Sequence, residues 1–140
     1  MKYIKDQENL EGKKILLRLD LNVPLKNGVI TDQTRIDKIL PIIKFLVEKK
    51  SKILIISHVG RPKGKVKEEL SLKPIRNSLE KKVNKKIKLI KENIFDLRKE
   101  DLFQDSSDQI IFLENIRFYK EEEENDSNFS KHLAKLADIF

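Results

Sequence analysis

A basic turn that contains a histidine and an arginine follows a short apolar run in residues 52–64. Residues 53–56 are all aliphatic, with no polar alternation, which is typical of a strand buried on both faces of a parallel sheet. Ligands of open α/β sheets bind beyond the carboxyl ends of the strands, and imidazole and guanidinium groups both donate hydrogen bonds. The segment therefore predicts an anion site at Ser57, His58, Gly60 and Arg61, although taken alone the turn could equally be a solvated basic loop.

The glycines of this turn do not predict a phosphate-binding loop for a nucleotide. Gly60 and Gly64 are too close together for a P-loop, and Val66 stands where a serine or threonine would follow Lys65. The chain has only four glycines, and they form no GxGxxG pattern. This segment is therefore not expected to hold a nucleotide.

A carboxylate and an amide end another predicted strand, at residues 14–21. Strict alternation along that strand would place Arg18, Asp20 and Asn22 on one face, with the last two nearest its carboxyl end. Such a pair could bind hydroxyl groups or orient an arginine. The commoner alternative is that Asp20 pairs with Arg18 or caps a turn.

Two more arginines lie at the boundaries of predicted elements. Arg117 follows the buried strand expected at residues 109–113, and Arg35 lies at the start of an amphipathic helix, off its apolar stripe. Pro41 implies that this helix either begins just before the proline or is kinked there. An arginine in such a place usually holds a planar anion.

The remaining segments are predicted to support these elements. A helix is expected at residues 72–83 with Ser71 as its N-cap, a strand at 86–90, a helical turn within 97–102, and a last helix after residue 126. His132 is off the apolar stripe of that last helix and is expected at the surface. The glutamates at 121–124 are expected to form a solvated loop rather than a metal site, since consecutive glutamates cannot converge on one ion. Residues 138–140 look like the start of a further strand.

Composition restricts the class of protein. The 140 residues suit one domain with a hydrophobic core. The formal charge of +7 comes mostly from lysines scattered beside acidic residues, so a solvated surface is favoured over a nucleic-acid-binding face. The absence of cysteine excludes disulfides and thiolate metal sites, and the sequence contains no signal peptide or membrane span. A cytoplasmic protein without membrane contact is expected.

Six segments together resemble the N-terminal domain of the phosphoglycerate kinases, in order and in spacing. They are RLDLNVPL at 18–25, ITDQTRI at 30–36, SHVGRPKG at 57–64, SLKP at 71–74, LENIRF at 113–118 and EEEEND at 121–126. The resemblance covers nearly the whole chain. It implies an α/β fold with a doubly wound parallel sheet and helices on both faces, similar to the Rossmann fold, truncated before its last strand or strands.

The resemblance also implies a function. Residues 1–140 would be a partial N-terminal domain that binds 3-phosphoglycerate for reversible phosphoryl transfer between ATP or ADP and 3-phosphoglycerate or 1,3-bisphosphoglycerate in glycolysis. MgATP or MgADP would be bound by a C-terminal domain absent from this chain, which itself would bind no nucleotide or metal. The full-length enzyme is expected to be a monomer that acts on small molecules and not on nucleic acid, and the fragment alone is expected to be inactive.

The substrate-binding residues carried over from the family are Asp20, Asn22, Arg35, His58, Val59, Gly60, Arg61 and Arg117. The resemblance assigns stabilisation of the transferring phosphoryl group to Arg35 as the catalytic residue, and contacts with the glycerate moiety to Asp20 and Asn22. Phosphoryl transfer depends mostly on positioning and on charge stabilisation, and the nucleophile here is an already ionised substrate carboxylate, so arginines matter more than a protein base.

Departures from the family pattern are mild and touch no charged contact. Val59 and Ile116 stand where leucine is frequent, and Tyr119 stands where histidine is frequent. The alternative that remains is a stand-alone basic module that binds anions or nucleic acid without catalysis, through contacts that weaken with salt.

Overall fold

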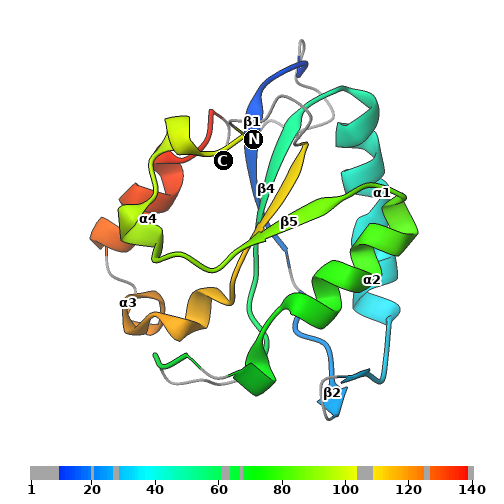
Figure 1. The fold of residues 1–140 in the computed structure, drawn as a ribbon, viewed down its shortest axis with the longest axis horizontal. Helices are drawn as coiled ribbons and strands as arrows, with labels where there is room; N and C mark the ends of the chain where they lie inside the picture. Colours follow the sequence, from blue (N-terminus) through cyan, green and yellow to red (C-terminus); the bar gives the residue numbers. More distant parts are fainter. Residues whose placement is uncertain are drawn as a thin grey trace.

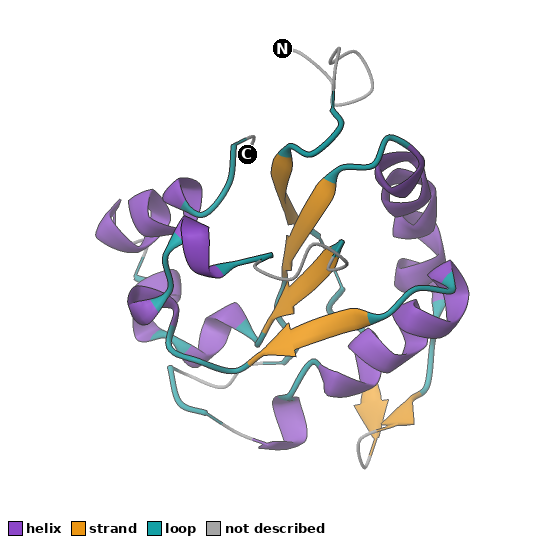
Figure 2. Ribbon diagram, turned by 45° about the horizontal axis from the view of Figure 1, so that its top comes forward, coloured by secondary structure: helices purple, strands orange, loops and turns teal. Residues whose placement is uncertain are grey.

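Four parallel strands form the central sheet of the part of the chain that the structure describes (Figures 1 and 2). The structure is a computed structural model that describes residues 10–19, 21–26, 29–60, 64–66, 68–103, 109–124 and 127–138. The strands are β1 (Lys14–Arg18), β4 (Lys52–Ile56), β5 (Ile87–Ile90) and β6 (Ile110–Leu113). Their spatial order is β1-β4-β6-β5, so β6 lies between the two strands that precede it in sequence.

Strand β4 is buried on both faces of the sheet, which explains its continuous aliphatic run. Ile53 and Ile55 belong to one hydrophobic core, whereas Leu54 and Ile56 belong to the other. β4 pairs with β1 on one side and with β6 on the other, so neither of its edges meets water. The buried parallel strand expected at residues 53–56 is confirmed.

Helices cover both faces of the sheet. Helices α1 (Thr34–Glu48) and α2 (Lys73–Val83) pack on one face through an apolar stripe that includes Ile36, Ile43, Leu46, Ile75 and Leu79. Helix α4 (Ser127–Lys135) and the short 3₁₀ helices η3 (Ile94–Asp96) and η4 (Lys99–Asp101) cover the other face, as Figure 1 shows. The predicted α/β, Rossmann-like class is therefore confirmed.

Helix α1 begins at Thr34, seven residues before Pro41, so the alternative in which the helix starts just before the proline is wrong. The helix starts early because Asp32 Oδ1 accepts hydrogen bonds from the Thr34 backbone N–H at 2.9 Å and from the Thr34 hydroxyl at 2.6 Å. Both bonds lower the pKa of Asp32 below its usual value, and the bond from the hydroxyl has the larger effect. These two bonds restrain Thr34, the first residue of α1, which precedes Arg35.

Strand β1 ends at Arg18, three residues earlier than expected, so strict alternation does not extend to Asn22. Arg18 forms an ion pair with Glu122 in the short helix α3 (Lys120–Glu123). The glutamates at 121–123 therefore lie in a short helix that is joined to the end of β1 by this ion pair, instead of the solvated loop that was expected. The prediction failed because Arg18 and Glu122 are far apart in sequence.

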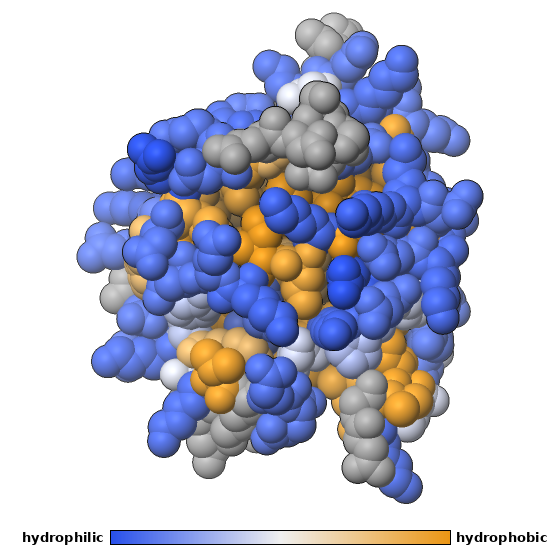
Figure 3. All heavy atoms as spheres, in the orientation of Figure 1, coloured by the Kyte–Doolittle hydropathy of each residue, from blue (hydrophilic) through white to orange (hydrophobic). Residues whose placement is uncertain are grey.

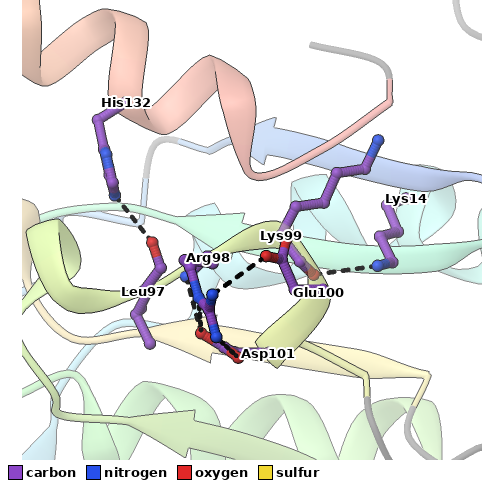
Figure 4. Close-up of polar contacts among 7 residues, drawn as sticks. All are labelled: Lys14, Leu97, Arg98, Lys99, Glu100, Asp101 and His132. Carbon is purple, nitrogen blue, oxygen red and sulfur yellow. Dashed lines mark hydrogen bonds and ion pairs between the residues drawn. The ribbon is translucent and has the colours of Figure 1, made fainter.

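The position of His132 also differs from the expectation. Its Nε2 lies 3.0 Å from the Leu97 carbonyl oxygen and its ring lies 5.5 Å from the Phe95 ring, so the side chain is half-buried against η3 (Figure 4). In the same region the Lys14 ammonium donates to the Lys99 carbonyl oxygen at 3.0 Å (Figure 4). The first contact attaches α4 to the segment between η3 and η4, and the second attaches η4 to the amino end of β1.

The remaining short elements are β2 (Leu25–Lys26) and β3 (Val29–Ile30), which form an antiparallel pair, and the 3₁₀ helices η2 (Glu68–Leu70) and η5 (Ile116–Phe118). Asn27 and Gly28, a residue pair whose types favour a tight turn, and residues 139–140 of the expected last strand lie outside the described residues. Asp138 is described, and its backbone N–H donates to the Lys14 carbonyl oxygen at 2.7 Å. No helix in the described part of the chain is both long and apolar enough to cross a membrane.

Candidate functional site

The topology brings the loops that follow β1, β4 and β6 to one edge of the sheet. These strands are neighbours and run parallel, so their carboxyl ends lie together. The chain leaves β4 toward α2 on one face and leaves β6 toward α4 on the other face. Loops that diverge in this way leave a crevice, which is where open α/β sheets bind ligands.

Five of the eight predicted site residues follow these strands in the described part of the chain, and Arg35 comes from α1. Asn22 follows β1, residues 58–60 follow β4, and Arg117 follows β6 within η5. Asp20 and Arg61 lie outside the described residues.

Asn22 joins three segments of this edge. Its side-chain Oδ1 accepts a hydrogen bond from the Gly60 N–H at 3.0 Å. Its backbone carbonyl accepts a hydrogen bond from Arg35 Nη1 at 3.1 Å. Both Asn22 and Arg35 are exposed, so a ligand can reach them. The structure thus brings together the β1 loop, the β4 loop and the start of α1.

The turn after β4 depends on glycine. Gly60 has a φ of +63°, and a Cβ added there would lie 2.7 Å from Leu70 Cδ2. Val59 is 1% exposed and belongs to the hydrophobic core, so only its backbone is placed to meet a ligand. His58 is half-buried in the same turn.

Arg117 is tied to this turn through its backbone. Its carbonyl oxygen accepts a hydrogen bond from the Gly64 N–H at 3.2 Å. Its side-chain Nε is buried and has no hydrogen-bond partner. Arg76 Nε is also buried without a hydrogen-bond partner. Arg76 lies away from the site, however, and its Nη1 makes a structural hydrogen bond to the Ile87 carbonyl oxygen at 3.1 Å. A buried guanidinium nitrogen without a partner is costly, so an anion that reached Arg117 would remove that cost.

Two polar side chains at this edge are buried. Ser57, which the sequence placed in the anion site, is 1% exposed and bonds to the backbone instead, and Asn115, to which the sequence assigned no role, is 0% exposed. The Ser57 hydroxyl donates to the Leu19 carbonyl oxygen at 2.7 Å and accepts from the Leu21 N–H at 3.1 Å. The Asn115 amide donates to the carbonyl oxygens of Val59, at 2.9 Å, and Leu70, at 3.0 Å. The only sequence signal is a polar residue directly after an apolar strand, which does not identify its partners.

The N-terminus of α2 is already occupied by a carboxylate of the chain itself. Glu114 accepts hydrogen bonds from the Leu72 N–H and the Ser71 hydroxyl, both at 2.7 Å. The expected cap residue, Ser71, accepts a bond from the Lys73 N–H at 3.2 Å. A carboxylate at a helix N-terminus is favourable because the exposed N–H groups and the helix dipole are positive there. This helix end is therefore not available to a ligand.

A cavity of about 300 Å³ lies beside Glu114, but none of the predicted site residues lines it. Its lining residues are Val66, Glu68, Ser71, Lys91, Asn93, Glu114, Phe118 and Tyr119. The Tyr119 hydroxyl accepts from the Ile94 N–H at 2.9 Å, and burial raises the pKa of this phenol. The cavity is therefore a feature separate from the edge that holds Asn22, Arg35 and Gly60.

Within the described ranges, no three histidine, cysteine, aspartate or glutamate side chains lie together as they would around a metal ion. The polar groups of the edge are mostly N–H donors, which suit an anion and not a cation.

Known proteins match almost the entire chain. The family model described as phosphoglycerate kinase matches residues 4–140. The phosphoglycerate kinase of Dictyoglomus turgidum is 47% identical over 133 residues, which are 95% of this chain and 33% of that protein. The phosphoglycerate kinase of Borreliella afzelii is 42% identical over 140 residues, which are 100% of this chain and 36% of that protein. The chain thus spans about a third of the length of these relatives.

Solved structures give the same result. The phosphoglycerate kinase of Coxiella burnetii superposes with a TM-score of 0.85 at 40% identity, over 98% of this chain and 33% of its own. The enzyme of Pyrococcus horikoshii superposes with a TM-score of 0.82 at 28% identity, over 99% of this chain and 35% of its own. Since the family model covers nearly every residue and the relatives and the fold agree with it, this chain belongs to the phosphoglycerate kinase family.

Proposed function

We propose that residues 1–140 bind 3-phosphoglycerate at the carboxyl edge of β1, β4 and β6, as the acceptor side of a phosphoglycerate kinase. The observation that carries this proposal is the bridge at Asn22, which joins the β4 turn through Gly60 and the first turn of α1 through Arg35. Membership of the family supplies the reaction, and the bridge supplies a place where anion-binding groups from separate segments meet.

Each proposed contact follows from the chemistry of the side chain. Asp20 and Asn22 contact the hydroxyl and carboxylate groups of the glycerate. His58, Arg61 and Arg117 bind the substrate phosphate, together with backbone groups of Val59 and Gly60. Arginine suits this role because its fork donates two parallel hydrogen bonds to a planar or tetrahedral anion. The unpartnered Nε of Arg117 supports this assignment.

Arg35 has the catalytic role in this proposal. The substrate carboxylate attacks the transferred phosphoryl group, and negative charge spreads over the phosphoryl oxygens as the bonds change. A guanidinium held by the Asn22 carbonyl is pre-oriented, so it stabilises that charge without reorganising first. No protein base is needed, since the carboxylate is already ionised at neutral pH.

The phosphoryl donor is proposed to bind outside these residues. MgATP and MgADP are the nucleotides of this kinase family, and they supply the phosphoryl group and the charge-neutralising metal ion. The described residues offer neither a metal-ligand cluster nor a glycine-rich phosphate loop for them. The residues of this chain would bind and orient the acceptor and exclude water from it.

A small-molecule substrate is proposed in preference to nucleic acid. Several basic side chains are already paired with acids, including Lys82 with Asp37 and Lys99 with Asp138. Such pairing leaves the described residues with a mixed surface and not a continuous basic face, and apolar residues also lie among the hydrophilic ones on the face drawn in Figure 3. The proposed protein is a glycolytic kinase of the cytoplasm.

Calorimetric titration of the 140-residue chain with 3-phosphoglycerate tests the proposal. Saturable 1:1 binding that weakens with added salt is expected, with inorganic sulfate as the comparison ligand and Arg117→Ala as the weakened variant. Lys44→Ala serves as the matched control, because it removes an exposed charge from α1 nine residues after Arg35, more than two turns from the bridge. Equal affinity for sulfate and 3-phosphoglycerate, or tighter binding of single-stranded DNA, would favour the basic-module alternative.

A further inference from the structure

We propose that Ser57 and Asn115 are positioning residues that fix the relative placement of the three substrate-binding loops. This inference rests on the proposed function and adds to it two residues that no ligand can touch. Ser57 is 1% exposed and Asn115 is 0% exposed. Any effect that they have on substrate binding must therefore pass through the groups that they hold.

Ser57 holds the loop after β1. Its hydroxyl donates to the Leu19 carbonyl oxygen at 2.7 Å and accepts from the Leu21 N–H at 3.1 Å. These two backbone groups lie on either side of residue 20 and directly before Asn22. The Leu19 N–H still donates to the Ile56 carbonyl oxygen of β4 at 3.1 Å, and the Ser57 hydroxyl extends this attachment to the Leu21 N–H, next to Asn22.

Asn115 holds the turn after β4 and the start of η5. Its Nδ2 donates to the carbonyl oxygens of Val59 and Leu70, and its Oδ1 accepts from the Arg117 N–H at 3.0 Å. Every hydrogen-bonding atom of this buried amide therefore has a partner in one of three separate segments. A fully satisfied buried network specifies one arrangement, whereas apolar packing alone would tolerate small shifts.

The peptide group between Val59 and Gly60 connects Asn115 to Asn22. Its carbonyl oxygen accepts from Asn115 and its N–H donates to Asn22. In a trans peptide these two groups point in opposite directions within one plane, and the described chain has no cis peptide. A rotation of this peptide that broke one bond would also break the other.

A continuous series of hydrogen bonds therefore runs from one proposed substrate arginine to another. It passes from the Arg35 side chain to Asn22, through the 59–60 peptide to Asn115, and on to the Arg117 backbone. The Ser57 carbonyl also accepts from the Ile116 N–H at 3.1 Å, which joins the β4 and β6 ends directly. Anion binding by several donors requires that they keep fixed distances, and a displacement of about 1 Å can cost a large factor in activity.

Ser51 offers a matched control for Ser57. The two serines flank β4, both are buried, and each donates its hydroxyl to a backbone carbonyl near an end of β1. Ser51 donates to Leu10 at the amino end of the strands, away from the site. Ser57→Ala and Ser51→Ala should therefore cost similar stability, but only Ser57→Ala should change substrate affinity.

Asn93 offers a matched control for Asn115. Each asparagine begins a 3₁₀ helix and accepts, through Oδ1, a hydrogen bond from the N–H two residues later. Serine can keep that capping bond at either position, but it cannot reach Val59 and Leu70 from position 115. Asn115→Ser therefore removes the positioning contacts, whereas Asn93→Ser does not.

The experiment measures 3-phosphoglycerate affinity by calorimetry and the amide exchange rates of Gly60 and Arg117 by NMR, on the whole chain at a temperature where each variant is folded by circular dichroism. We expect Ser57→Ala and Asn115→Ser to weaken binding by about tenfold or more, and the two controls to stay within about twofold. Exchange at Gly60 should accelerate in Asn115→Ser but not in Asn93→Ser, whereas exchange at Arg117, whose capping bond serine keeps, should stay unchanged in both variants. If Asn115→Ser does not fold, the serine pair decides the question.

Equal affinities within both matched pairs would overturn the positioning role. If the unmodified chain does not bind 3-phosphoglycerate, the proposed function fails, but the exchange measurement still tests the inference because it needs no ligand. Unchanged exchange of Gly60 in Asn115→Ser would then overturn it, and faster exchange of Gly60 in that variant alone would support it.

Discussion

Asn22 and Asn115 contact opposite sides of a single peptide group, the one that joins Val59 to Gly60. Asn22 Oδ1 accepts from the Gly60 N–H at 3.0 Å, and Asn115 Nδ2 donates to the Val59 carbonyl oxygen at 2.9 Å. One asparagine is exposed at the candidate site and the other is completely buried. The peptide group that meets the exposed Asn22 is therefore also held from the interior of the protein.

Three glycines with positive φ allow a graded test of the turns. Gly12 and Gly64 both have a φ of +72°, and Gly60 has a φ of +63°. A Cβ added at Gly12 would meet no atom within 4 Å, whereas a Cβ added at Gly60 would meet the flexible end of the Leu70 side chain. A Cβ added at Gly64 would lie 2.9 Å from the Lys120 backbone. We expect alanine to cost about 1 kcal/mol at Gly12, somewhat more at Gly60 and about 3 kcal/mol at Gly64, as measured by urea unfolding. Equal costs at Gly12 and Gly64 would show that the approach to Lys120 is not as close as described.

Arg35 should contribute more to turnover than to binding. In a phosphoglycerate kinase that carries this segment, Arg35→Ala should lower kcat by about 100-fold with a smaller change in substrate affinity, because charge on the phosphoryl group develops in the transition state. Arg117→Ala should also weaken binding. Steady-state kinetics with varied 3-phosphoglycerate separate the two parameters, and Arg35→Lys serves as the control that keeps the charge without the fork. The division of roles is wrong if both alanine variants lose kcat and affinity in the same proportion.

The 140-residue chain alone should show no kinase turnover. The proposed site holds the acceptor, and closure around donor and acceptor is what excludes water in such kinases. A coupled assay with ATP and 3-phosphoglycerate measures this, with a mock purification as the control for contaminating enzyme. Turnover above that control would mean that this chain also supplies the donor site.

Asp138 should contribute a pH-dependent part of the free energy of unfolding. A hydrogen bond from the Lys14 backbone N–H, at 2.9 Å, is the main cause that lowers the pKa of Asp138, and Lys99 adds to it. Because the folded pKa is lower than the unfolded pKa, the stabilisation is present above the unfolded value of about 3.9 and is lost as the pH falls through the folded pKa.

Asp138→Asn tests this linkage. The substitution should reduce the unfolding free energy by about 1 kcal/mol at pH 7, since one charge-assisted hydrogen bond and one partly exposed ion pair are weakened. The difference from the unmodified chain should shrink as the pH is lowered below 4. Urea unfolding at several pH values measures it, with Lys99→Ala to separate the ion pair from the backbone bond. A difference that is constant across this range would show that the carboxylate does not titrate as described.

Local patterns in the sequence determined most of the elements and the polar residues that follow them. Four consecutive aliphatic residues at 53–56 indicated a strand buried on two faces, and the structure places Ile53 and Leu54 in different cores. Such patterns suffice because burial on both faces leaves no position for a polar side chain. The same reasoning placed His58 and Arg117 after adjacent parallel strands, and their roles in binding stay predictions.

Only the tertiary structure decided which distant groups meet. The order of the strands, with β6 between β4 and β5, depends on a crossover that passes over one strand position, which no local pattern encodes. The same is true of the Arg18–Glu122 pair, of His132 on Leu97, and of the buried amide of Asn115. The type of a polar side chain shows that it needs hydrogen-bond partners when it is buried, but its partners here are backbone groups that only folding brings near. Backbone groups are present at every residue, so the sequence alone does not distinguish Val59 and Leu70 from any other carbonyl as the acceptors of Asn115.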